Sequence, residues 1–281
     1  MNGKFICPVC KVKYATDEIL EHNDKLYFCA KNHTFDISSE GYVNLDNAKS
    51  SHSKDSGDNK QMCAARSGFL EKGYYSVFAN ALSNTAKTLL QGTEGYIADA
   101  GCGEGYYLRN MRDNGISSTR LSGIDLARSA VKMAAKREKS RTDQIRYAAA
   151  SVFDMPYADN SLAAVLSVFA PVSEKEANRT LHDGGYLLVA SPGEDHLWEF
   201  KGALYDIPYP NSEKAVAYTG FSHIETKRVA FEITLPNVDI QNLFYMTPYC
   251  WKSPRETQEK LESLNDLTTK AQFLISVYKK L

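Results

Sequence analysis

The 281-residue chain has no apolar segment long enough to cross a lipid bilayer. Its longest mainly apolar run, residues 162–172, is about half of the roughly 20 residues that a spanning helix needs, and Ser167 interrupts it. The first eight residues contain no apolar core of the kind that a secretory signal requires. We therefore expect a cytoplasmic protein without a membrane partner.

The chain also lacks an excess of either charge. Its 33 Lys and Arg residues are balanced by 34 Asp and Glu residues, for a net charge of −1 with neutral histidines. A nucleic-acid partner would therefore need a local basic patch or a dedicated module. Six cysteines are too few for a disulfide scaffold, and clustered cysteines in a reducing compartment are typical of metal sites.

Three of the cysteines lie near the N-terminus in a paired pattern. Cys7 and Cys10 flank two residues, and eighteen residues later Cys29 is followed closely by His33. Two such pairs on tight turns can enclose a tetrahedral Zn²⁺, and three thiolates with one imidazole leave no open position for water. The pattern predicts a structural zinc site in a module, residues 1–45, that folds around its metal.

A redox dithiol is the alternative interpretation of the first cysteine pair. Such a pair usually begins a helix after a strand, whereas Pro8 and its polar neighbours favour a turn. His22 is a second candidate ligand, but it lies between charged residues and a solvated role fits it better.

Residues 46–60 hold no strongly apolar side chain, which predicts a linker, and we place it at residues 46–68. Helix and strand patterns alternate over residues 69–281. This alternation predicts an α/β fold with a doubly wound, seven-stranded sheet, whose last two strands, residues 222–235 and 269–278, are antiparallel.

A glycine-rich turn follows the first buried strand of this region. Gly101, Gly103 and Gly105 alternate with other residues, Asp99 precedes them, and Asp125 ends the next strand about twenty residues later. A dinucleotide fingerprint, GxGxxG, would aim backbone amides at a pyrophosphate, so NAD or a nucleotide is the alternative ligand. The GxGxG spacing after an aspartate resembles instead the class I methyltransferases that use S-adenosylmethionine (SAM). In that interpretation Asp125 accepts hydrogen bonds from the ribose hydroxyls.

The loop after the strand at residues 145–150 is expected to wrap the adenine. Many relatives have an aspartate where this chain has Ser151, so we expect the contacts to come from Ser151 and Val152. Asp154 is the acidic alternative, and a turn or helix cap explains it equally well.

The loop after the fourth strand, residues 169–172, contains no side-chain nucleophile. It also lacks the Asn/Asp-Pro-Pro-aromatic pattern of exocyclic-amine methyltransferases. Such an apolar loop suits in-line methyl transfer to an acceptor that is held in position rather than attacked covalently.

Several segments together resemble one family. They are the paired zinc ligands and residues 35–45, 56–58, 62–70, 73–75, 99–107, 169–171, 191–193, 196–197 and 246–248. The chain resembles the large-subunit (23S) rRNA guanine-N1 methyltransferases of the RlmA/RrmA type, which carry an N-terminal zinc module. The resemblance spans nearly the whole chain, and the Gly-Tyr-Val-Asn-Leu stretch at residues 41–45 is more specific than the glycine loop.

The resemblance implies methyl transfer from SAM to N1 of a guanine in a 23S rRNA hairpin, with Zn²⁺ on Cys7, Cys10, Cys29 and His33. It further implies that the zinc module, residues 1–45, recognises the RNA and helps to hold the hairpin. It also implies SAM contacts from Tyr75, Glu104 and His196. The full set of expected cofactor-binding residues is Tyr75, Asp99, Gly101, Gly103, Glu104, Asp125, Ser151, Val152 and His196. The sequence does not identify the general base. The candidates are Asp36, Glu104 and Asp154.

Phosphate contacts are expected from the basic side chains of two segments. These are Lys4, Lys11 and Lys13 in the zinc module and Arg128, Lys132, Lys136, Arg137, Lys139 and Arg141 farther along the chain. A solvated helix face explains the second group equally well. Two other functions stay open: methylation of a small molecule with the zinc module as a lid, and a SAM-binding scaffold without turnover. A homodimer is also left open.

Overall fold

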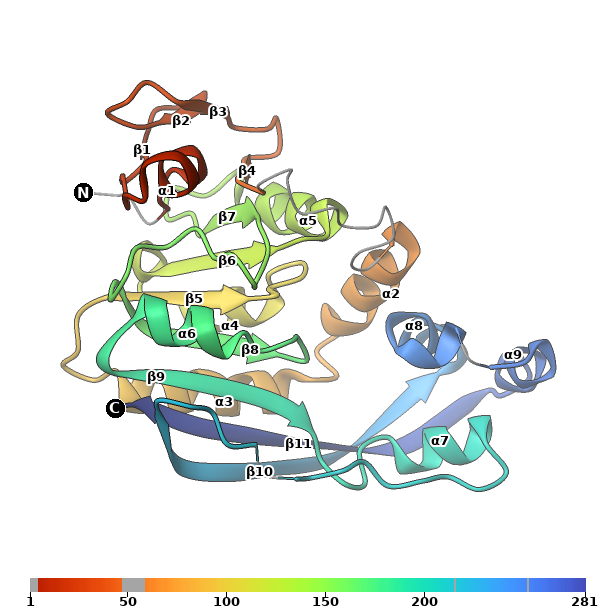
Figure 1. The fold of residues 1–281 in the computed structure, drawn as a ribbon. Helices are drawn as coiled ribbons and strands as arrows, with labels where there is room; N and C mark the ends of the chain where they lie inside the picture. The colour runs from red at the N-terminus through yellow and green to blue at the C-terminus, as the bar shows by residue number, and fades with distance from the viewer. Residues whose placement is uncertain (1–4, 47–58, 215, 252) are drawn as a thin grey trace.

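A computed structural model of the chain describes residues 5–46, 59–214, 216–251 and 253–281 (Figure 1). The helices in this part are α1 (Pro8–Tyr14), α2 (Lys60–Leu70), α3 (Ser76–Leu89), α4 (Tyr106–Asp113), α5 (Arg128–Glu138), α6 (Glu174–Thr180), α7 (Trp198–Leu204), α8 (Asn237–Met246) and α9 (Arg255–Glu262), with 3-10 turns η1 (Ser118–Arg120) and η2 (Pro248–Trp251). The strands are β1 (Glu21–His22), β2 (Leu26–Phe28), β3 (Thr34–Asp36), β4 (Val43–Asn44), β5 (Tyr96–Ala100), β6 (Leu121–Asp125), β7 (Arg146–Ala149), β8 (Leu162–Val168), β9 (Leu181–Pro192), β10 (Phe221–Pro236) and β11 (Asp266–Lys280).

The main sheet has the strand order β10-β11-β9-β8-β5-β6-β7-β4. Strands β4 to β9 of this sheet pair in parallel, and β11 pairs antiparallel with both β9 and β10. Every residue of β8 is buried, as expected of a central strand covered on both faces. Figure 1 shows α6 on one face of the sheet and α3 and α4 on the other. The predicted doubly wound α/β fold with its antiparallel end is therefore confirmed.

An eighth strand joins the seven that the sequence predicts. The short strand β4, from the N-terminal module, pairs in parallel with β7, with Val43 opposite Ala148 and Asn44 opposite Ala149. Without it, β7 would be an edge strand with unpaired backbone groups. The module therefore contributes directly to the main sheet.

Side chains of the module also pack against the main domain. Phe5 is buried and its ring lies 5.6 Å from that of Tyr157, and the backbone N–H of Ile6 donates to the carbonyl of Pro156 at 2.9 Å. The buried side chains of the module belong to the same apolar cluster as Ala148 and Ala150. The module and the main sheet therefore share one core, and the predicted linker does not keep them apart.

The predicted linker, residues 46–68, ends earlier than the sequence suggested. Residues 60–68 belong to helix α2, and residues 47–58 lie outside the described part. Helix α2 begins at an Asn59 cap, whose side chain accepts from the N–H of Met62 at 2.9 Å, and it packs against α8. Helix α2 ends at Leu70 and α3 begins at Ser76, because the chain turns between them at Gly73 with φ +79°.

Within the described ranges, no helix combines the length and the apolar character that a membrane crossing requires.

Candidate metal centre and cofactor cavity

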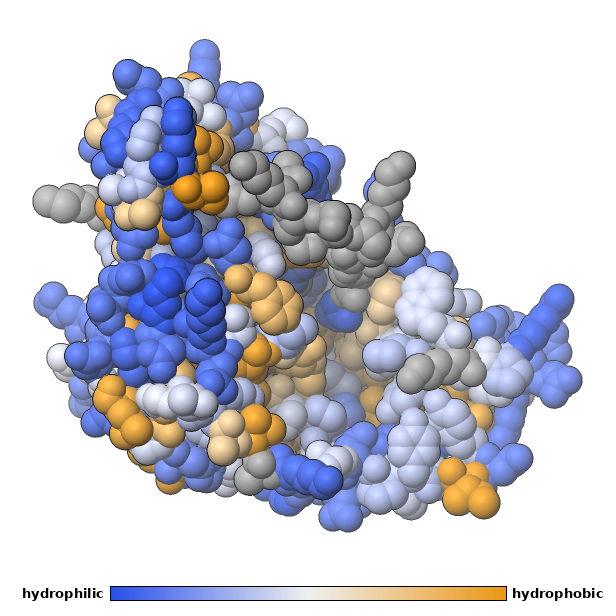
Figure 2. Space-filling model, viewed as in Figure 1, coloured by the Kyte–Doolittle hydropathy of each residue, from blue (hydrophilic) through white to orange (hydrophobic). Residues whose placement is uncertain are grey.

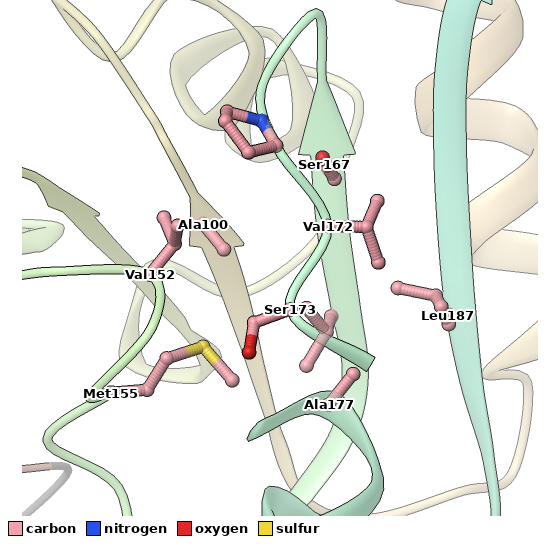
Figure 3. A pocket seen from close by; sticks show the side chains of 10 residues that line it. Ala100, Val152, Met155, Ser167, Val172, Ser173, Ala177 and Leu187 are labelled. Atoms are coloured by element: carbon pink, nitrogen blue, oxygen red, sulfur yellow. The ribbon is translucent and has the colours of Figure 1, made fainter. Parts of the chain in front are cut away.

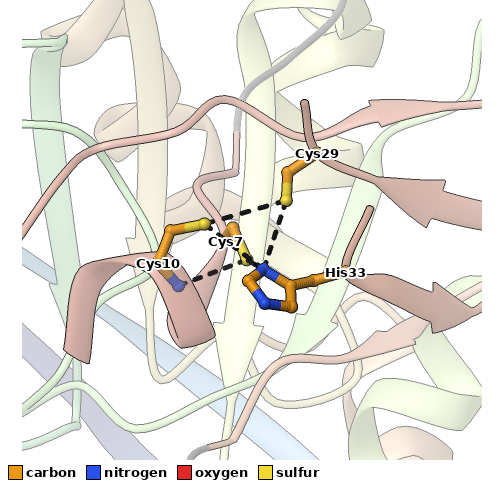
Figure 4. Close-up of side chains that lie close together, drawn as sticks. All are labelled: Cys7, Cys10, Cys29 and His33. Carbon is orange, nitrogen blue, oxygen red and sulfur yellow. Dashed lines mark hydrogen bonds between the residues drawn. The ribbon is translucent and has the colours of Figure 1, made fainter. Parts of the chain in front are cut away.

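The four predicted zinc ligands converge on one point (Figure 4). Cys7 caps helix α1, and its Sγ accepts from the N–H of Cys10 at 3.4 Å. Cys29 and His33 come from the turn between β2 and β3, where the N–H of Cys29 donates to the carbonyl of His33 at 3.1 Å. The four ligand atoms all lie within 4.8 Å of one another, and the three cysteines are buried.

The spacing of these atoms fits a tetrahedral Zn²⁺. Zn–S bonds of about 2.3 Å place two thiolates about 3.8 Å apart, and a Zn–N bond of about 2.0–2.1 Å places a thiolate and an imidazole nitrogen about 3.5 Å apart. The Sγ atoms of Cys10 and Cys29 are 3.7 Å apart, and the His33 Nδ1 lies 3.3–3.5 Å from the three sulfurs. The His33 Nδ1 is therefore the ligand atom of the imidazole.

The buried cysteines need a cation before they can ionise together. Burial, with added contributions from the neighbouring cysteines, raises the pKa of the Cys10 thiol to about 12. Three thiolates packed this closely require a cation among them, which Zn²⁺ supplies when it binds.

A cavity of about 770 Å³ opens where the parallel strands end. Ligands of doubly wound folds bind at this edge of the sheet. Figure 2 shows the molecule hollowed beside the region of α8, with apolar side chains on the wall of the hollow. Eight of the nine predicted cofactor residues line it, namely Tyr75, Gly101, Gly103, Glu104, Asp125, Ser151, Val152 and His196.

The glycine loop needs its glycines for two physical reasons. Gly101 has φ +89°, and a Cβ there would lie 2.4 Å from the Cβ of Ala170. Gly105 has φ +79°, and a Cβ there would lie 2.5 Å from the hydroxyl oxygen of Tyr147. Gly103 faces open space on the cavity wall, so the backbone is directly accessible to a ligand there.

Asp125 stands at the end of β6 and is braced by two backbone amides. Its Oδ2 accepts from the N–H of Gly103 at 2.9 Å and its Oδ1 from the N–H of Ala127 at 2.8 Å. Burial nevertheless raises the pKa of this carboxyl above its usual range, although both bonds lower it. A carboxylate that is partly buried and held in one orientation can accept hydrogen bonds from two adjacent hydroxyl groups.

Glu104 is buried in the cavity wall and paired with two arginines. Its Oε2 accepts from Arg109 at 3.1 Å and from Arg137, while its Oε1 has no hydrogen-bond partner among the described residues. Burial raises the pKa of this carboxyl, and the two guanidinium groups oppose that shift. The open Oε1 fits the ammonium group at the amino-acid end of SAM.

Asp99 is the one predicted cofactor residue that does not line the cavity. It is fully buried beneath the glycine loop, and neither carboxyl oxygen has a hydrogen-bond partner within the described ranges. Burial, followed by the nearby charge of Asp125, raises the pKa of Asp99 to about 7. A direct contact from Asp99 to the cofactor therefore stays a prediction.

Tyr75 and His196 approach each other across the cavity, with ring centroids 6.1 Å apart. The buried hydroxyl of Tyr75 lacks a hydrogen-bond partner among the described residues, so it is open to a ligand. Burial lowers the pKa of His196 to about 3, and its Nδ1 accepts from the N–H of Gln272 at 3.2 Å. The ring is therefore neutral at pH 7 and carries its proton on Nε2, where it can donate.

Two of the three general-base candidates lie away from the cavity. Asp36 is exposed on β3 of the zinc module, and Asp154 pairs with Lys11 at 2.5 Å. The structure brings neither carboxylate to the cavity wall. Only Glu104 is in place, and its Oε2 is bound to two arginines.

The opposite wall of the cavity comes from residues that the sequence reasoning on the cofactor did not assign. Arg66 of α2 reaches the end of α8, where its Nη2 donates to the carbonyl of Met246 at 3.1 Å. Thr247, Pro248 and Tyr249 follow on the same wall. Arg66 and the stretch at residues 246–248 lie in segments that carry the family resemblance, and that was the one signal that could have found them.

A small void of about 10 Å³ lies beside the main cavity (Figure 3). Its lining comes from β5, β8, α6, β9 and the loops after β7 and β8, and it shares Val152 and Pro171 with the cavity wall. Such a volume is at the lower limit for a single water molecule. It is therefore no second ligand site, but it leaves the loop after β7 loosely packed on its inner side.

Comparison with known proteins identifies the family. The description "RlmA, N-terminal", a zinc ribbon, matches residues 5–54, and "Methyltransferase domain" matches residues 97–185. The 23S rRNA (guanine(748)-N(1))-methyltransferase of Streptomyces fradiae is 33% identical over 200 residues, or 70% of this chain and 66% of that relative. This chain belongs to the zinc-ribbon family of 23S rRNA guanine-N1 methyltransferases.

Two further members of the family match more of the chain. YxjB of Bacillus subtilis (strain 168), named for a 23S rRNA guanine-N1 methyltransferase, is 29% identical over 97% of this chain and 96% of its own length. A relative from Micromonospora griseorubida with the same kind of name is 29% identical over 86% of this chain and 85% of its own length. As a SAM-dependent methyltransferase of this family, the chain uses SAM and Zn²⁺, which confirms both predicted cofactors.

Proposed function

We propose that this chain transfers a methyl group from SAM to N1 of a guanine in a hairpin of 23S rRNA. The observation that carries the proposal is the presence, in one chain, of the zinc ribbon and the SAM cavity, matched over 97% of the chain by a relative named for this activity. The proposal places the reaction in the cytoplasm, where we expect the rRNA. A homodimer stays a prediction.

The acceptor would bind beside the loop after β8. Phe169 lines the cavity there with 47% of its surface exposed, and its backbone is left-handed at φ +56°. A non-glycine residue in this conformation is strained, and such strain is typical of functional loops. The exposed ring offers a stacking surface for a base that is unpaired or flipped from its helix.

The chemistry requires N1 of guanine to lose a proton as it attacks. SAM supplies an electrophilic methyl group when it is bound, so the protein has to orient the base, exclude water and let the proton leave. The apolar wall of Phe169, Pro171 and Pro248 suits the first two tasks. With Asp36 and Asp154 placed elsewhere and Glu104 held by arginines, we propose an ordered water as the proton acceptor.

The predicted phosphate contacts need revision. Lys11, Lys132, Arg137 and Arg141 each pair with a carboxylate of the chain, and Lys4 lies outside the described part. The exposed cations that remain are Lys13 on α1 and Arg128, Lys136 and Lys139 on or beside α5. We propose that these four contact the RNA backbone, and the affinity should then fall as salt rises.

A small-molecule methyltransferase with the zinc module as a lid is the other function considered. None of the described residues 5–46 lines the cavity, and the module instead caps the β7 edge of the sheet. A module in that position does not cover the cavity. The structure and the named relatives therefore favour the rRNA acceptor.

Mapping of the modified base tests the proposed function. N1-methylguanine blocks Watson–Crick pairing, so reverse transcription of 23S rRNA should stop at one guanine in cells that contain this gene and read through in cells that lack it. The purified enzyme with SAM should restore the stop on unmodified rRNA. Full read-through under both conditions would reject the proposed acceptor.

Replacement of Phe169 by alanine tests the stacking surface. Base–aromatic stacking contributes about 1–3 kcal/mol per base, so we expect Phe169→Ala to reduce the rate of rRNA methylation at subsaturating RNA by about 5- to 150-fold. Phe169→Tyr keeps the aromatic face and should stay close to wild type. SAM affinity, measured by calorimetry without RNA, should be unchanged in both variants. Equal methylation rates for the alanine and tyrosine variants would contradict the stacking role.

A further inference from the structure

The loop from Ser151 to Tyr157 faces two sites at once. Ser151, Val152 and Phe153 line the SAM cavity. The next residues of the loop face the zinc module, which lies on the other side (Figure 1). Any force that shifts the loop therefore changes the wall of the cofactor site.

Helix α1 of the zinc module holds this loop directly. Lys11 forms an ion pair with Asp154, with Nζ 2.5 Å from Oδ1, and donates to the carbonyl of Met155 at 3.3 Å. These residues are more than 140 positions apart in the sequence. The Asp154 side chain is 42% exposed and the Lys11 side chain 21%, so the pair is partly shielded from water.

The zinc ligands set the position of Lys11. Cys7 caps α1 and Cys10 lies within it, so two of the four ligands belong to the same short helix as Lys11. A helix of seven residues is too short to be stable alone. Its orientation, and with it the reach of Lys11, therefore depends on the metal cluster.

Further polar contacts of the loop come from α6. The Oε2 of Glu176 accepts from the N–H of Met155 at 2.8 Å, and Arg179 donates to the carbonyl of Met155 at 2.9 Å. Lys11 Nζ also lies 3.6 Å from the Oε2 of Glu176. The backbone of Met155 is thus clamped between α1 and α6 by charged side chains.

Packing on the inner side of the loop is incomplete. Figure 3 shows the side chains of Val152 and Met155 reaching into the small void, opposite Ala100 of β5 and Val172. Met155 is nevertheless 1% exposed, so the loop is held both by apolar packing and by the polar contacts from α1 and α6. The hydrogen bonds from Lys11, Glu176 and Arg179 to the backbone of Met155 help to fix the position of the loop.

We propose that Lys11 is a positioning residue for SAM binding, through which occupancy of the zinc site sets the conformation of the Ser151–Phe153 wall. This role goes beyond holding RNA, and it depends on the cofactor assignment rather than on the rRNA acceptor. Coupling between two sites is reciprocal, so bound SAM should in turn hold the zinc more firmly.

The first test compares variants of the full chain without RNA. Lys11→Met should raise the SAM dissociation constant in calorimetry by about fivefold or more, with one zinc per chain retained. Lys11→Arg keeps a cation of similar reach and should restore most of the affinity. Lys13→Met, on the exposed side of the same helix, should bind SAM like wild type. Because no RNA is present, the result is independent of whether the rRNA proposal holds.

The second test uses the metal itself. Saturating SAM should raise the zinc affinity, measured at equilibrium by competition with a chelator, by about fivefold or more in the wild-type protein, and this gain should disappear in Lys11→Met. If Lys11→Met proves unstable, Asp154→Asn removes the same ion pair from the loop side and should weaken SAM binding in the same direction. Wild-type SAM affinity in both variants, or equal losses in Lys11→Met and Lys13→Met, would overturn the proposal.

Discussion

Replacement of Asp125 by alanine is expected to weaken SAM binding by about 1.5–3 kcal/mol, or about 10- to 150-fold. A hydrogen bond to a charged acceptor contributes about this much when the acceptor is buried, and Asp125 lies in the cavity wall with its carboxylate already oriented by two amides. The alanine variant also loses the bond to the N–H of Gly103, so the glycine loop itself should loosen. Calorimetric titration with SAM measures the effect.

Asp125→Asn is the matched control for this prediction. The amide oxygen can keep one of the two backbone bonds, whereas the negative charge is lost, so its SAM affinity should lie between those of wild type and Asp125→Ala. Unchanged affinity in the alanine variant would show that the ribose binds elsewhere and that the assignment of the loop is wrong.

Removal of zinc should destabilise the whole chain, not only the module. The module buries Phe5 against Tyr157 and adds β4 to the sheet, so unfolding it opens the core of the methyltransferase domain. We expect a loss of about 3–5 kcal/mol, the size of deleting one large core aromatic, and a fall in melting temperature of about 6–20 °C. A linker at residues 46–68, as the sequence suggested, would instead confine the change to the module, residues 1–45.

Elemental analysis and calorimetry check this prediction together. The native protein should contain one zinc per chain, and the double variant Cys7→Ala plus Cys29→Ala should contain none and melt earlier. Cys250→Ala alters a cysteine outside the cluster and should keep both the zinc and the melting temperature. Zinc-free native protein, or full zinc retention in the double variant, would contradict the site.

The sequence was sufficient where the signal was local. The zinc ligands follow from their paired spacing, although the first pair lies on helix α1 and not on the expected turn. The strands β5 and β6 follow from short apolar runs beside glycines, and β8 follows from an apolar run alone. The glycine loop could also be predicted from the sequence. Its glycines are required because Gly101 and Gly105 have no space for a side chain. These features depend on residues that are close in sequence, so one segment at a time reveals them.

Helix α2 has a local helical pattern that the predicted linker does not reflect. Its buried residues, Met62, Ala65 and Phe69, recur at helical spacing. The predicted linker nevertheless covers residues 60–68, because they directly follow a segment, residues 46–60, that carries no strongly apolar side chain.

Tertiary structure alone decided the roles that depend on distant partners. Asp154, a candidate base by sequence, proved to be the partner of Lys11, 143 residues away. The docking of the zinc module on β7 and the closure of the cavity by residues 246–249 are contacts of the same kind. Such pairings leave no periodicity in the chain, because they arise only when the sheet brings its strand ends together. The sequence by itself therefore determined which metal and cofactor this protein binds, and the fold determined how the two sites are joined.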